Sequence, residues 1–121
     1  MLETAVRFLE EQARLGRTPS YTEVNSALAR RGGHRSFDFD QDGERAAMGE
    51  LLGQVTQQKY DEVGAMLSAI VIYLNENDPG LGFYRLASAL GLLRPGPSKD
   101  QRLDFWARQV ALVHNHYRAQ P

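Results

Sequence analysis

Apolar side chains recur every three or four residues in several stretches of the chain, which is the spacing of one helix face. This spacing predicts helices over residues 2–15, over residues 21–31, and from about residue 42 or 44 to residue 60. A further helix is expected after Ser98, where Ser98 and Gln101 are placed as a capping box ahead of another such stripe.

Other stretches lack the helical period and predict strands. The run MLSAIVIYL, residues 66–74, is apolar almost throughout and β-branched at its centre, as in a strand covered on both faces. Turn residues follow at 75–80, and GLGFYRL, residues 80–86, predicts a returning strand that continues into a short helix. RSFDF, residues 35–39, alternates and predicts a short edge strand.

Two glycines interrupt the third predicted helix. Gly49 and Gly53 lie four residues apart, and each costs about 1 kcal/mol of helix stability relative to alanine. Such glycines usually permit the close approach of another backbone, so we expect another helix or the sheet to pack there.

The elements together predict one α+β domain over residues 1–121, mostly helical, with about five helices and one short β-hairpin or small sheet. The order of helices and hairpin is winged-helix-like.

With no cysteine, the chain forms no disulfide and no thiolate metal site. No apolar run is long enough to span a bilayer, and the N-terminus lacks a signal-peptide pattern. We therefore expect a cytoplasmic protein without membrane contact.

Basic residues accompany the predicted winged helix. With 14 basic and 15 acidic residues the net charge is −1, which argues against a wholesale polyanion binder but allows a local basic patch. This pattern predicts a non-enzymatic binding module that contacts nucleic acid or a nucleic-acid-handling complex. The expected contacts, arginines and a lysine for phosphates and amides for base edges, are Arg30, Arg31, Arg35, Arg45, Gln54, Gln58 and Lys59.

Two observations weigh against this interpretation. About ten residues separate the second and third predicted helices, more than the short turn of a helix-turn-helix. The predicted wing tip carries Glu76 and Asp78, which would repel phosphate. A solvated charged rim explains the basic residues at least as well.

An apolar surface supports an alternative function. The stretch LGFYRLASALGLL holds more large side chains than one short helix easily buries, so an aromatic patch and the C-terminal helix could serve a stoichiometric protein–protein binder. Such a protein would be an inhibitor, an adaptor or an immunity-type protein, and the same helix could form a homodimer. The expected contacts are Phe83, Tyr84, Trp106 and Tyr117. The competing expectation is that aromatic residues at helical spacing belong to the core.

The stretch SFDFDQDGER places acids at alternate positions ahead of a glycine, as a calcium loop does. Asp38, Asp40 and Asp42 would fill loop positions 1, 3 and 5. Position 12, which needs a bidentate carboxylate, falls on a glycine one residue before Glu50. The favoured interpretation is a polar turn in which Asp40 or Asp42 caps the third helix, with weak metal binding or a metal-dependent enzyme as the alternatives. We expect no cofactor and no catalytic constellation.

The C-terminal two thirds of the chain resembles a family of small bacterial and mobile-element proteins. The resemblance runs from RAAMGELLGQV through MLSAIVIYLNENDPGLGFYRLASALG to DFWARQVALVHNHYR. Its shared features are an apolar strand, a P-G-x-G-F turn and a closing F-W helix. It implies a bacterial, phage or plasmid context and no particular activity.

Overall fold

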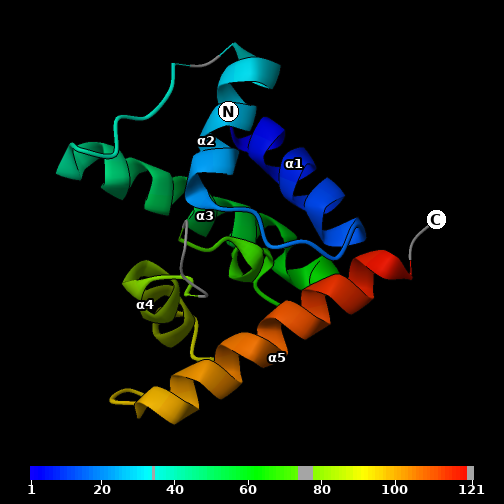
Figure 1. The fold of residues 1–121 in the computed structure, drawn as a ribbon. Coiled ribbons are helices and arrows are strands. Elements are labelled where there is room, and N and C mark those ends of the chain that lie inside the picture. The colour runs from blue at the N-terminus through cyan, green and yellow to red at the C-terminus, as the bar shows by residue number, and fades with distance from the viewer. Residues whose placement is uncertain (34, 74–77, 120–121) are drawn as a thin grey trace.

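Helices account for nearly all regular structure in the part of the chain that the computed structural model describes, residues 1–33, 35–73 and 78–119 (Figure 1). They are α1 (Leu2–Arg14), α2 (Tyr21–Gly32), α3 (Asp42–Val63), the 3₁₀ helix η1 (Leu67–Ile70), α4 (Leu81–Ala89) and α5 (Lys99–Arg118). α1 packs against α2, α3 and α5, while α4 contacts α3 on the other side of the domain.

The predicted α+β class is wrong, because these described residues contain no β-sheet. Their one element of strand pairing is an isolated parallel bridge between Ser20 and Ile72. Residues 35–39, expected as an edge strand, form a loop, and α4 begins at Leu81 where a returning strand was expected. The expected wing tip falls largely on residues 74–77, which lie outside the described residues.

The helices with local start signals lie where the sequence predicts them. Ser98 caps α5 in the predicted capping box, in which Ser98 Oγ accepts from the Gln101 amide at 3.1 Å. Ser20 and Glu23 form an equivalent box at the start of α2. α3 begins at Asp42 with Gln41 as its N-cap and no side-chain cap, so the expectation that Asp40 or Asp42 caps it is wrong.

The apolar run expected as a strand crosses the middle of the helical domain. Every residue from Ala65 to Val71 is buried. The segment turns on itself through bonds from the Ala69 amide to the Met66 carbonyl and from the Val71 amide to the Ser68 carbonyl. The described part of the run is therefore a buried connector with a 3₁₀ turn, because no strand of the described residues lies beside it to form a ladder.

Side chains of α3 and α5 bond to the backbone of this connector. A buried backbone group without a partner is costly, so each such bond replaces one that a sheet would have supplied. The bonds run from the Met66 amide to Gln109 Oε1 (2.9 Å), from the Ser68 amide to Thr56 Oγ1 (3.2 Å), and from Trp106 Nε1 to the Ala69 carbonyl (2.8 Å).

The connector also joins the two apolar clusters of the core. The larger cluster is formed by α1, α2, α3 and α5 around Leu67 and Ile70. The smaller cluster gathers α4 and α5 around Met66 and Ala69. No helix in the described residues is both long enough and apolar enough to cross a bilayer.

Replacing Gln109 by leucine is expected to lower the free energy of unfolding by about 1–3 kcal/mol, because the buried Met66 amide would lose its acceptor. Urea unfolding followed by circular dichroism measures the change. The same substitution at Gln58, which is exposed on α3, should change stability by no more than about 0.5 kcal/mol. Equal losses in the two variants would mean that the bond to Met66 contributes nothing specific.

Candidate functional site

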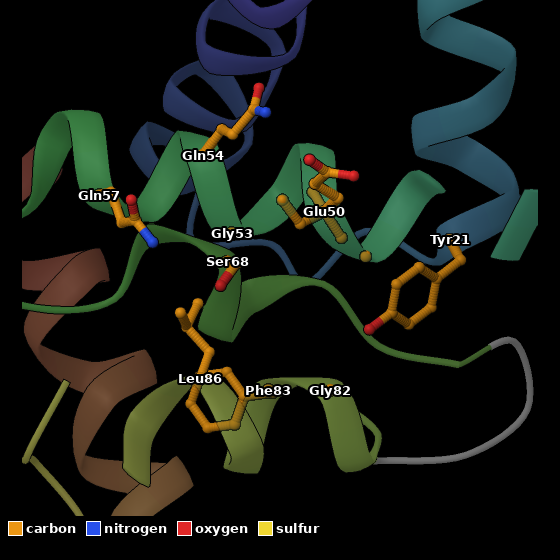
Figure 2. A pocket seen from close by; sticks show the side chains of 11 residues that line it. Tyr21, Glu50, Gly53, Gln54, Gln57, Ser68, Gly82, Phe83 and Leu86 are labelled. Carbon is orange, nitrogen blue, oxygen red and sulfur yellow. The ribbon is translucent and has the colours of Figure 1, made fainter. Parts of the chain in front are cut away.

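A concave feature lies along the exposed side of α3, between the start of α2 and α4. It consists of two adjoining hollows of about 430 Å³ and about 580 Å³, which share Tyr21, Gly49 and Gly82. We call their combined surface the α3 groove. Figure 2 shows the first hollow, with α3 on one side and Phe83 and Leu86 of α4 on the other.

Two glycines leave the face of α3 that borders the groove without large side chains. Gly49 is exposed, and a Cβ atom built on it would meet nothing within 4 Å. A Cβ atom on Gly53 would lie 3.9 Å from Leu86 Cδ2. The sequence identified these two glycines as positions of close approach, but the expected packing partner is absent at Gly49, so its face is left open among the described residues.

Apolar side chains form most of the remaining walls. Phe83 and Leu86 of α4 line the first hollow, and Phe39, Met48 and Tyr73 line the second. Sequence reasoning assigned Phe83 to a patch but did not connect it with Met48, Phe39 or Tyr73, because only the fold brings these four segments together.

Tyr21 lies where the two hollows meet and is positioned by two contacts. Its hydroxyl donates to the Pro79 carbonyl at 2.6 Å, and its ring centroid lies 5.2 Å from that of Tyr73. Burial, followed by the neighbouring Tyr73 and Asp78, raises the pKa of Tyr21 well above its ordinary value. The side chain is therefore a neutral phenol at any physiological pH, and it presents a ring to the groove.

The floor of the first hollow contains a buried hydroxyl. Ser68, which is 7% exposed, accepts a hydrogen bond from Thr56 Oγ1 at 2.7 Å. Figure 2 places Ser68 between Gly53 on α3 and Leu86 on α4. Polar side chains at the rim, Glu50, Gln54 and Gln57, are exposed and bond to none of the described residues.

The arginines expected to contact phosphates mostly form ion pairs within the molecule. Arg31 pairs with Glu11 at 2.5 Å, and its guanidinium lies 5.1 Å from the Phe8 ring centroid. Arg35 pairs with Glu44 at 2.5 Å. These two acids belong to α1 and α3, and the sequence around each arginine did not predict that they would pair with it.

Arg45 and Arg30 differ in their surroundings. Arg45 pairs with Asp42 and donates to the Phe39 carbonyl at 2.6 Å. Arg30 is exposed at the end of α2 and has no ion pair or hydrogen bond with the described residues. Gln58, like Gln54, is exposed on α3. The predicted nucleic-acid contacts therefore lie on α2, on α3 and in the loop between them, and several of them are paired with acidic side chains.

Lys59 is the most enclosed of the predicted contacts. Its side chain is 19% exposed, and its Nζ lies 2.5 Å from Glu62 and 3.3 Å from Glu10. The hydrogen bond to Glu62 raises the pKa of Lys59, and the same bond lowers the pKa of the Glu62 carboxyl. Glu10 also accepts from the Tyr117 hydroxyl at 2.8 Å, so Lys59 belongs to a polar joint between α1, α3 and α5.

The aromatic residues expected to form a protein-binding patch mostly lie in the core. Phe83, Tyr84 and Tyr117 are buried, and Trp106 is partly buried with its indole bonded to the Ala69 carbonyl. The competing expectation that aromatics at helical spacing belong to the core therefore describes these side chains. Only Phe83 reaches the α3 groove.

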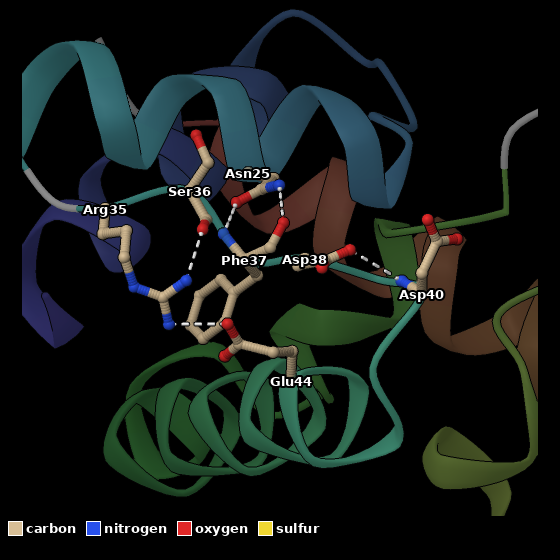
Figure 3. A network of polar contacts seen from close by, with 7 residues as sticks. All are labelled: Asn25, Arg35, Ser36, Phe37, Asp38, Asp40 and Glu44. Atoms are coloured by element: carbon tan, nitrogen blue, oxygen red, sulfur yellow. Dashed lines mark hydrogen bonds and ion pairs between the residues drawn. The ribbon is translucent and has the colours of Figure 1, made fainter.

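The aspartate-rich stretch forms a turn between α2 and α3 (Figure 3). Asn25 of α2 holds it by donating to the Phe37 carbonyl at 2.9 Å and accepting from the Phe37 amide at 2.8 Å. The Asp38 carboxylate accepts from the Asp40 amide at 3.1 Å. No group of three or more acids or histidines suited to a metal ion occurs among the described residues.

Comparisons with known proteins identified no relative of this chain. No protein-family model matches the chain, and neither curated proteins nor solved structures gave a match. The resemblance to small bacterial and mobile-element proteins stays a prediction.

Replacing Lys59 by methionine is expected to lower stability by about 1–2 kcal/mol at pH 7, because the largely buried side chain of Glu10 would lose its cation. The raised pKa of Lys59 means that its contribution is complete below about pH 10.4 and is lost as pH rises through the folded value. The lowered pKa of Glu62 means that its contribution is present above about pH 4.3 and is lost on further acidification.

Urea unfolding of wild type and variant at pH 7 and about pH 3 checks this dependence. The difference between the two proteins should shrink at the lower pH, because the contribution from Glu62 is lost as the pH falls through its lowered pKa. Methionine at the exposed Lys99 is the matched control and should have little effect at either pH. A difference that stays constant with pH would contradict an ionic role for Lys59.

Proposed function

We propose that the protein is a non-enzymatic protein-binding module that holds a segment of its partner in the α3 groove. The observation that supports this most is the open, glycine-containing face of α3 opposite the apolar wall of α4. Each glycine in a helix costs about 1 kcal/mol relative to alanine, yet Gly49 supports no internal packing. A bound segment lying against α3 would explain why a glycine occupies this helical position, because a side chain there would obstruct the segment.

The composition of the groove suits binding better than chemistry. Its apolar walls, with polar groups at the rim and floor, are typical of recognition sites, and each hollow falls within the usual range of about 300–1,000 Å³. The Ser68 hydroxyl bonds to Thr56, and no histidine, lysine or carboxylate of the described residues is hydrogen-bonded to it as a base. The lining therefore favours the protein-binder alternative over a hydrolase, although the surface differs from the expected aromatic patch.

Filling the groove with tryptophan at Gly49 is expected to abolish binding without unfolding the protein, since the space above this position is open. A random nonapeptide display library panned on the wild-type protein supplies the probes. Selected peptides should bind the wild type and lose at least about tenfold in affinity for Gly49→Trp, measured by fluorescence polarisation. Circular dichroism confirms that the variant is folded.

Leu112→Trp is the matched control, because Leu112 is 48% exposed on α5, which contributes no side chain to the groove. It should bind the selected peptides as the wild type does. Failure to select any peptide, or equal binding by Gly49→Trp, would refute the groove as a recognition site.

Nucleic-acid binding is a second candidate function, favoured by one observation. Arg30 is unpaired among the described residues, and the side chain of Arg35 is 74% exposed, so the end of α2 offers cations. The ion pair of Arg31 is exposed, and such pairs contribute only about 0–1 kcal/mol and can open.

A gel shift with 30-nucleotide DNA and RNA at graded salt tests the second candidate. Binding should weaken steeply with salt, and Arg30→Ala combined with Arg31→Ala should reduce both the affinity and the salt slope for every sequence. Replacement of Arg7, an exposed arginine of α1, by alanine provides the control. No shift at about 10 μM protein and low salt would exclude this function.

A further inference from the structure

We infer that the α3 groove takes an extended, basic peptide segment, with a backbone carbonyl at Ser68 and a lysine or arginine beside Glu50. This inference rests on the proposed function and names the chemistry of the partner. Three features of the groove lead to it: a buried donor, an unpaired carboxylate, and free amide side chains along α3.

Ser68 offers the occupant a hydrogen-bond donor. Its oxygen accepts from Thr56, while its own hydrogen meets no acceptor among the described residues. The side chain is 7% exposed and lies in the first hollow between α3 and α4 (Figure 2). A hydroxyl donor at the floor of this hollow, between the apolar side chains of Phe83 and Leu86, favours a ligand that places an oxygen there.

The charge at the rim favours a cationic occupant. Glu50 is exposed beside the first hollow and forms no ion pair with the described residues. Arg45, the cation of the second hollow, is already paired with Asp42 and bonded to the Phe39 carbonyl. The remaining ionisable groups of the lining are the phenols Tyr21 and Tyr73. An acidic segment would therefore face an unpaired carboxylate, whereas a basic one gains a partner.

The free amides distinguish an extended segment from a helix. Gln54 and Gln57 stand along α3 at the rim, and each offers both a donor and an acceptor. A helical segment satisfies its central backbone groups internally and needs no such partners. An extended segment leaves its N–H and C=O groups open, which matches Ser68 and these two amides, while its apolar side chains would pack on Phe83 and Leu86.

The experiment uses the peptides selected from the nonapeptide library on the wild-type protein. They should be enriched in lysine and arginine, and Glu50→Lys should weaken their binding at least about tenfold, because the partner cation would meet a like charge. Enrichment in acidic residues, or unchanged affinity for Glu50→Lys, would overturn the basic preference.

The role of Ser68 is tested with two variants that both remove the hydroxyl bond between Thr56 and Ser68, of which Thr56→Val also removes the acceptor of the Ser68 amide and so perturbs the connector more. Ser68→Ala removes the hydroxyl that faces the groove, whereas Thr56→Val removes its internal partner and leaves Ser68 in place. Peptide binding should weaken about fivefold or more only in Ser68→Ala, with both variants checked for folding by circular dichroism. Equal losses in both would refute recognition by Ser68.

The conformation of the bound peptide completes the test. Carbon chemical shifts of an isotope-labelled selected peptide should be those of an extended chain, and helical shifts would overturn the inference. These outcomes are separate from failure of the proposed function itself, which is shown by peptides that bind Gly49→Trp as well as the wild type.

Discussion

A length of peptide backbone buried without a sheet is the constraint on which the rest of this structure depends. Residues 65–71 are all buried, and a buried backbone amide or carbonyl must find a partner. Gln109, Thr56 and Trp106 supply bonds from two helices that lie on either side of the connector. The positions of α3 and α5 are thereby fixed relative to the connector, and so are the two apolar clusters that meet on it.

The sequence predicted what depends on neighbours in the chain and missed what depends on distant ones. The apolar periodicity and the Ser98 capping box are local, and α1, α2, α3 and α5 begin close to the expected residues. The composition of residues 66–74 is that of a strand, but a strand needs a second one beside it. Here the partners are side chains distant in sequence, and no local pattern indicates that Gln109 reaches the Met66 amide.

The candidate site shows the same division. Gly49 and Gly53 could be singled out from their spacing, although the groove they line depends on how α4 and the start of α2 are placed. The basic residues could be identified in the sequence, but the sequence did not indicate which acidic residues of other helices pair with them. The pair of Lys59 and Glu10 is an example. Ser68 gave no sequence signal, since an isolated serine in an apolar run acquires meaning only from its surroundings.

The joint between Glu10 and Tyr117 bears on how the domain forms during synthesis. Tyr117 is fully buried, and the residue it bonds to lies near the opposite end of the chain. The first helix therefore emerges from the ribosome long before the surface that covers it exists. Until the final turns of α5 are made, the apolar face of α1 stays partly uncovered and open to chaperones or to misassociation.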